Sequence, residues 1–177
     1  MTETRASILE HAKLITIELG ELPSLNDVAN AAGVSKGGLM HHFPSRQAML
    51  EALVKQAIEE VDLALDTAAQ EDTLLRTWLD LSVPHPSETA LFRSLATAFF
   101  AASSSQGPMT KLVADANERW ESILTLHLGG ADLARVARLL ADGLLLGSIA
   151  GTITPQNADE HVATAHRALI ALRGDIR

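Results

Sequence analysis

The sequence contains no cysteine and no tyrosine, and aromatic residues make up only 3% of its 177 positions. The absence of cysteine excludes disulfides, thiolate metal sites and cysteine nucleophiles, and it suits a reducing compartment. The shortage of aromatic rings leaves little on which unpaired bases could stack. A nucleic-acid partner, if the chain has one, is therefore expected to be a duplex.

Long hydrophobic runs are also absent. The polar N-terminus, MTETRASILEHAK, has no basic region followed by an apolar core, so it lacks the pattern of a signal peptide. The most apolar stretch, residues 139–151, contains Asp142 and is too short to cross a bilayer. With 47% hydrophobic and 20% charged residues, the composition is that of a globular protein. We expect a cytoplasmic protein that does not contact membranes.

The formal net charge of −8 argues against broad electrostatic binding to nucleic acid. The charge is unevenly distributed, however. Residues 1–50 hold four Lys or Arg against five Asp or Glu, a net of −1, so the rest of the chain carries −7. Within residues 33–55, Lys36, Arg46 and Lys55 are opposed by Glu51 alone, and this segment is a small basic island.

Apolar residues recur at helical spacing along nearly the whole chain, and no segment alternates as a strand would. The pattern predicts an all-α protein of about nine helices. A long fourth helix starts after Ser45, and further helices are predicted over residues 73–82, 88–103, 109–128, 131–153 and 156–173. The apolar stripe of the first helix consists of Ile8, Leu9, Ala12, Ile15 and Leu19.

Two short helices lie between the first and the fourth, and capping residues mark their ends. Ser24 with Asp27 three residues later forms a capping-box pattern, and Gly33 ends this second helix. Ser35 can cap a third helix, which Pro44 ends. The two helices and the tight turn between them have the proportions of a helix-turn-helix.

The third helix is expected to have a buried and an exposed face. When Leu39 is directed to the core, a turn of about 100° per residue places His41 on the opposite side and His42 back toward the protein. The two histidines then do not share a face. Because metal ligands on a helix need a spacing of three or four residues, we expect no metal site here, and no cofactor.

Gly37 and Gly38 lie side by side in this helix, and each weakens a helix by roughly 1 kcal/mol relative to alanine. One interpretation is a marginal helix. The other is that the missing side chains allow the backbone to approach a duplex closely. Lys36, Met40 and His41 would then reach base edges and phosphates in the major groove.

At this point the sequence resembles the TetR-type transcriptional regulators. The resemblance covers about fifty residues and depends on residue types and spacing over three helices. It runs from Arg5 through Gly20, Leu25, Asp27, Val28, Ala29, the segment AGVSKG at 32–37, Leu39, the segment HFPS at 42–45, and Leu50.

The resemblance implies an all-α homodimer with a helix-turn-helix DNA-binding domain at residues 1–46 and a ligand-binding and dimerisation domain at 47–177. Such proteins usually repress transcription from a palindromic double-stranded DNA operator until a small-molecule inducer releases them. Carried over by position, the implied DNA-contacting residues are Ser24, Ser35, Lys36, Gly37, Gly38, His41, His42 and Arg46.

Two positions depart from the family pattern. The family commonly has tyrosine where this chain has Met40, and that tyrosine usually touches a phosphate. Met40 cannot donate such a hydrogen bond, so it either touches a thymine methyl or packs. Gly38 often appears as threonine in the family. We therefore expect weaker direct readout than is usual. The later apolar stripes and Asp142 lead us to expect an apolar or cationic molecule as the inducer.

After residue 66 only the architecture resembles the family. Two apolar stripes, one around Leu95 and Phe99 and one around Trp120 and His127, are either ordinary core or the wall of a ligand pocket. Asp142 lies in an apolar helix, where an unpaired carboxylate is expensive to bury. It either pairs with an arginine or meets a cationic or hydrogen-bonding ligand. The candidate ligand-binding residues are Leu95, Phe99, Trp120, His127 and Asp142.

Gly143, Gly147 and Gly151 recur every four residues on the same helix, which indicates close packing against that face. With the apolar side of the last helix, this ridge predicts a two-fold four-helix dimer interface. The residues expected on the last helix are Ala158, Val162, Ala165, Leu169 and Leu172.

Two other classes of protein are alternatives to this interpretation. An enzyme is disfavoured, because the seven histidines are scattered and the serine of Gly147-Ser148-Ile149-Ala150-Gly151 stands one place early for a nucleophile elbow. A helical module that binds small molecules or proteins without binding DNA is the remaining alternative. Net acidity and Met40 make it conceivable.

Overall fold

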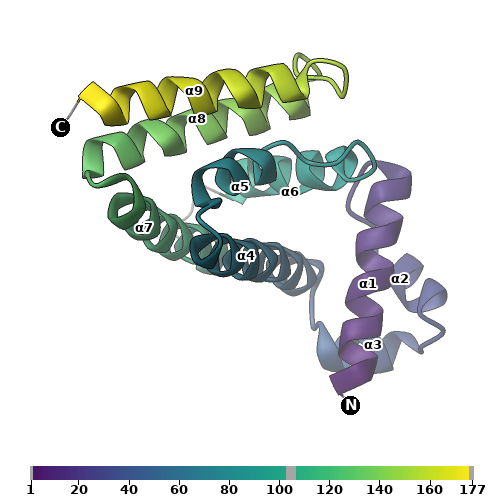
Figure 1. The fold of residues 1–177 in the computed structure, drawn as a ribbon. Helices are drawn as coiled ribbons and strands as arrows, with labels where there is room; N and C mark the ends of the chain where they lie inside the picture. Colours follow the sequence, from purple (N-terminus) through teal and green to yellow (C-terminus); the bar gives the residue numbers. More distant parts are fainter. Residues whose placement is uncertain (1, 103–106, 176–177) are drawn as a thin grey trace. The chain divides into compact units, whose positions relative to one another are not determined.

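The computed structural model describes the backbone of residues 2–102 and 107–175 and the side chains of residues 5–97 and 107–174. These residues form nine α-helices and no strand, so the all-α prediction is confirmed (Figure 1). The helices are α1 (Thr2–Leu19), α2 (Leu25–Ala31), α3 (Lys36–His42), α4 (Arg46–Gln70), α5 (Leu74–Leu81), α6 (Thr89–Ala102), α7 (Pro108–Leu128), α8 (Ala131–Ala150) and α9 (Ala158–Asp175).

Serine side chains cap three successive helices in the first part of the chain. Ser24 caps α2 through a capping box with Asp27, as the spacing predicted. Ser35 accepts a hydrogen bond of 3.0 Å from the backbone N–H of Gly38 at the start of α3. Ser45 does the same for Ala48 in α4, also at 3.0 Å. Each cap satisfies a backbone donor that a helix start leaves free.

The chain divides into two compact units. The first unit consists of residues 1–57 and 87–112, and the second of residues 58–86 and 113–177. Helix α4 continues without a break from the first unit into the second. The boundary between the two compact units therefore does not fall at residue 46. The first unit includes the start of α4 and also α6, which packs against α1. The functional division at 46 and 47 stays a prediction.

In the first unit, α1 packs against α2 and α6. The hydroxyl of Ser94 on α6 donates to the carbonyl of Gly20 at 3.0 Å, and Lys13 pairs with Glu88 at 3.4 Å. The predicted stripe of α1 is wrong at its end. Leu19 is 58% exposed, whereas Thr16 is fully buried and donates its hydroxyl to its own helix. Periodicity defines an apolar face but not where the packing partner stops.

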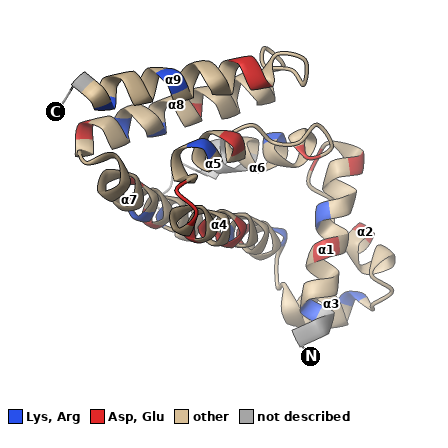
Figure 2. Ribbon diagram, in the orientation of Figure 1, with Lys and Arg blue, Asp and Glu red and all other residues tan. Residues whose placement is uncertain are grey.

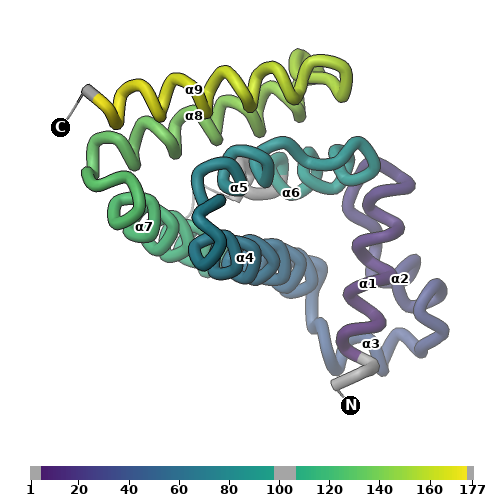
Figure 3. Tube along the Cα trace, in the orientation of Figure 1, coloured from purple at the N-terminus to yellow at the C-terminus, as the bar shows by residue number. Residues whose placement is uncertain are grey.

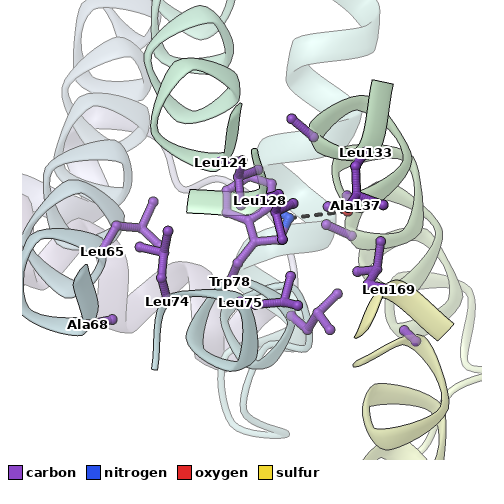
Figure 4. Packing of buried hydrophobic residues seen from close by; sticks show 14 of the residues in the cluster. Leu65, Ala68, Leu74, Leu75, Trp78, Leu124, Leu128, Leu133, Ala137 and Leu169 are labelled. Carbon is purple, nitrogen blue, oxygen red and sulfur yellow. Dashed lines mark hydrogen bonds between the residues drawn. The ribbon is translucent and has the colours of Figure 1, made fainter. Parts of the chain in front are cut away.

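The core of the second unit is formed by helices α4, α5, α7, α8 and α9 (Figure 4). At its centre the Trp78 indole N–H donates to the backbone carbonyl of Ala137 at 3.2 Å. Trp120 packs edge-to-face on Trp78 with ring centroids 5.8 Å apart. Large side chains that are at most 1% exposed include Leu65, Leu74, Leu79, Leu124 and Leu169.

Helices α8 and α9 lie side by side within the second unit (Figure 3). Val162, Ala165 and Leu169 of α9 are buried in the core of their own unit, so their predicted place in a dimer interface is wrong. A helical apolar stripe shows that a face is covered, but an intramolecular partner satisfies it as well as a second subunit does.

The three glycines of α8 have separate roles. A Cβ on Gly147 would lie 2.8 Å from the Ile153 side chain, so this glycine permits close packing of the following loop. Gly151 ends α8 in the left-handed conformation with φ of +76°. A Cβ on Gly143 would meet nothing within 4 Å. Of the three glycines predicted to form a ridge for a partner helix, only Gly143 has no other role within the unit.

Replacing Leu79 with alanine should destabilise the protein by about 2 to 5 kcal/mol, since it removes a fully buried side chain and leaves a cavity. Urea denaturation of wild type and variant at equal protein concentration measures the change. Leu126→Ala is the matched control, because Leu126 is 88% exposed. Equal losses for both variants would contradict the assignment of the core.

Candidate nucleic-acid interface

Helices α2 and α3 pack together around a turn at Gly33, whose φ is +65°. The Val34 N–H donates to the carbonyl of Ala29 at 3.0 Å across this turn. Leu39 is fully buried and Phe43 is 1% exposed, so both anchor α3 to the first unit. The small Ala29 is also buried, as close packing of the two helices requires.

The outward face of α3 is defined by the exposed residues that surround the buried Leu39. His41 is exposed and His42 is half-buried, as the helical placement predicted. Their rings meet edge-on with centroids 5.4 Å apart. The described part of the chain holds no group of three potential metal ligands. The exposed residues of α3 are Lys36, Gly37, Gly38, Met40 and His41.

The two glycines of α3 differ in what surrounds them. A Cβ on Gly37 would meet nothing within 4 Å, whereas one on Gly38 would lie 3.2 Å from the Ser35 hydroxyl oxygen of the helix cap. Packing within the protein thus gives no reason for glycine at 37, although alanine would favour the helix by roughly 1 kcal/mol.

Three of the predicted contact residues also make bonds inside the first unit. Ser24 donates its hydroxyl to the Asp27 carboxylate at 2.6 Å, and Ser35 caps α3. Arg46 donates through Nε to the carbonyl of Pro23 at 3.1 Å and through Nη2 to the carbonyl of Leu22. The direct contact of any of these residues with DNA stays a prediction.

The predicted ligand residues fall in both units. Leu95 is buried in α6 of the first unit, and the side chain of Phe99, also on α6, lies outside the described residues. Trp120 and His127 are half-buried on α7 in the second unit. Their role in binding a ligand stays a prediction.

A residue that the sequence reasoning missed is Asp62 on α4. Its carboxylate accepts from the Trp120 indole at 2.6 Å and from the Arg119 guanidinium at 2.8 Å. Acidic residues recur along α4 (Figure 2), so periodicity did not separate Asp62 from its exposed neighbours. Its position next to the half-buried Val61, on the edge of the apolar stripe, was the available signal.

Asp142 is not buried as the apolar helix suggested. Its side chain is 53% exposed and pairs with Arg138, one turn earlier on α8, at 3.1 Å. Partial desolvation raises the pKa of the Asp142 carboxyl, and the positive charge of Arg138 offsets part of this rise. The arginine pair, one of the two alternatives from the sequence, is therefore present, and Arg138 also lies 3.7 Å from Glu121 of α7.

No helix among the described residues is both long and apolar enough to cross a membrane.

A search of curated proteins finds no significant match. The family model of bacterial regulatory proteins, tetR family, matches residues 23–53, which include α2 and α3.

Solved structures of regulators share the fold over nearly the whole chain. A transcriptional regulator from Rhodococcus sp. Rha1 superposes with a TM-score of 0.76 at 18% identity, covering 94% of this chain and 96% of that one. A putative transcriptional regulator from Saccharomonospora viridis, in complex with choline, gives 0.74 at 21% identity over 94% and 95%. A putative TetR-family regulator from Rhodococcus sp. gives 0.67 at 20% identity over 94% and 98%.

The helix-turn-helix geometry, the family model on those helices and the shared fold lead to one conclusion. Residues 23–53 match the tetR family of bacterial regulatory proteins, and the chain has the all-α fold of these solved transcriptional regulators.

Proposed function

We propose that the protein is a cytoplasmic repressor that binds a palindromic operator as a homodimer and leaves it when a small molecule binds, and that it is not an enzyme. The observation that carries the DNA-binding part is the outward face of α3, where Gly37 has open space and no packing role. The backbone at Gly37 carries no side chain, and the exposed side chains of Lys36, Met40 and His41 lie on the same short helix. This arrangement suits close approach to a major groove.

The proposed direct contacts are divided by chemistry. The ammonium of Lys36 supplies a phosphate contact, and His41 can bond to a base edge or a phosphate. Met40 is 43% exposed, so it is available to a thymine methyl. Ser24, Ser35 and His42 stay candidates at the edges of the interface. Because Gly38 and Met40 offer no polar side-chain donor, shape and backbone contacts should contribute much of the affinity.

The inducer is proposed to be a small organic molecule that binds beside α7 in the second unit, where Trp120 and His127 lie half-buried. A relative of the same fold binds choline, which supports a pocket for small molecules in this architecture. Asp142 is no longer proposed as a ligand contact, since its carboxylate is exposed and paired with Arg138.

The dimer is proposed to form through the exposed side of α8. Leu139 is 61% exposed and Leu146 is 50% exposed on α8, with Gly143 between them at helical spacing. Ile170 and Leu172 on the neighbouring α9 are 46% and 43% exposed. Ile170 and Leu172 are two residues apart and therefore lie on different sides of α9. The patch that supports an association surface is thus the one on α8, and a second copy with the same patch fits a two-fold interface.

Gly37→Ala tests the DNA-binding face. The variant should be as stable as wild type or slightly more so, because the Cβ meets no protein atom. It should nevertheless bind the selected operator at least about tenfold more weakly, the equivalent of roughly 1.4 kcal/mol, since the methyl group keeps the backbone from the duplex. Fluorescence anisotropy with a labelled duplex measures this affinity. Gly174→Ala, at the far end of α9, is the control, and unchanged binding by Gly37→Ala would contradict the proposal.

Leu139→Asp tests the dimer. A charge in the proposed interface should convert the protein to a monomer at micromolar concentration in sedimentation velocity, with helix content unchanged by circular dichroism. Leu126→Asp, on the exposed side of α7, should leave the sedimentation coefficient at the wild-type value. A wild-type protein that sediments as a monomer, or a Leu139→Asp variant that stays dimeric, would remove this interface.

A further inference from the structure

We propose that Arg46 is a positioning residue that joins the start of α4 to the segment before α2 and so fixes the helix-turn-helix between them. Its main contribution is then not a contact with DNA phosphate. The inference rests on the DNA-binding function proposed above. It reassigns a residue whose place in the sequence pattern suggested a direct phosphate contact.

The first observation is the place of Arg46 in its helix. It is the first residue of α4, a helix of 25 residues with no acidic residue in its first turn. The start of a helix carries a partial positive charge, so a cation there is unfavourable by typically about 0.3 to 1 kcal/mol. An arginine at this position weakens its own helix, and its role is therefore to be found in the contacts it makes elsewhere.

Those contacts are two backbone carbonyls far back in the sequence. Nε donates to Pro23 at 3.1 Å, and Nη2 of the same guanidinium donates to Leu22. Both carbonyls lie between α1 and α2, outside any helix ladder. The bond to Pro23 is partly buried and the bond to Leu22 is exposed, so the carbonyl of Pro23 has the greater need of a donor from the protein. The planar guanidinium supplies two donors in fixed geometry, which the single ammonium of a lysine cannot reproduce.

The two bonds enclose the whole helix-turn-helix. They join residues separated by 23 and 24 positions, and everything between them is the cap Ser24, α2, the turn, α3 and the start of α4. The entry to α2 is thereby tied to the exit from α3. A second contact acts at the same exit, where the Arg5 guanidinium lies 4.8 Å from the centre of the Phe43 ring. Arg46 thus fixes the angle at which α2 supports α3.

The hydrogen bonds to Pro23 and Leu22 also limit which donors of the Arg46 guanidinium remain available to DNA. In arginine, Nε and Nη2 form an edge that commonly donates two hydrogen bonds to one phosphate. In this protein that edge of Arg46 donates to the backbone carbonyls of Pro23 and Leu22. A phosphate bound there would have to displace two hydrogen bonds within the protein. The geometry therefore favours orientation of the reading helix over direct charge contact.

Arg46→Lys separates the two roles, because lysine keeps the positive charge for a phosphate but lacks the planar pair of donors, Nε and Nη2, that meets the two carbonyls in fixed geometry. We measure binding of the full-length variant to the duplex that wild type selects and to an unrelated duplex, each over a series of NaCl concentrations. Positioning predicts that affinity for the selected duplex falls by about tenfold or more, that affinity for the unrelated duplex changes little, and that the salt slope is unchanged.

Lys36→Gln is the matched control for a true phosphate contact. It should weaken binding to both duplexes alike and lower the slope of log affinity against log salt by about 1. Arg46→Lys binding like wild type, or Arg46→Gln behaving like Lys36→Gln, would overturn the proposal.

Hydrogen–deuterium exchange in the absence of DNA gives an independent result. In Arg46→Lys the amides of residues 24–31 should exchange faster, whereas those of α8 and α9 should keep the wild-type rate. Unchanged protection of residues 24–31 overturns the positioning role whether or not DNA is bound. A wild-type protein that selects no duplex refutes the DNA-binding function instead, and the exchange result still decides the role of Arg46.

Discussion

The burial of Leu39 and Phe43 is the constraint on which the orientation of α3, and so the proposed DNA-binding face, depends. Helix α3 has seven residues, two of them glycine, and a peptide of that length and composition does not hold a helix in water. With Leu39 at 0% and Phe43 at 1% exposure, the helix is held by its apolar side, and only one rotation about its axis is allowed. That rotation decides that His41 faces solvent and that His42 turns back.

Because α3 is stabilised through its buried side, its exposed side can lack large side chains at Gly37 and Gly38. Capping by Ser35, the bond across the turn at Val34 and the closure by Arg46 stabilise the helix without using its exposed side. The outward positions are then free to be chosen for contact, and glycine at 37 is consistent with that freedom. A stable unit that presents an intrinsically weak helix agrees with the general finding that locally unfavourable residues gather at functional sites.

Features with a local cause were predictable from the sequence. The capping serines, the turn glycine and the two faces of α3 follow from hydrogen-bond chemistry within a few residues, and the structure has each of them. Features that depend on what packs against a helix were not. The buried Thr16, the intramolecular use of Val162 and Leu169, and the exposed Asp142 all reflect partners that periodicity does not identify. Asp62 was missed for the same reason, since its partners Arg119 and Trp120 follow it by 57 and 58 residues.

Selection of bound sequences from a random pool of duplex DNA by the purified protein tests the central claim most directly. The account predicts enrichment of an inverted repeat whose half-sites lie about one helical turn apart, roughly 10 base pairs between centres, as two copies of α3 in a two-fold dimer require. Recovery of no enriched sequence, or of a motif present only in single-stranded contaminants, would contradict it.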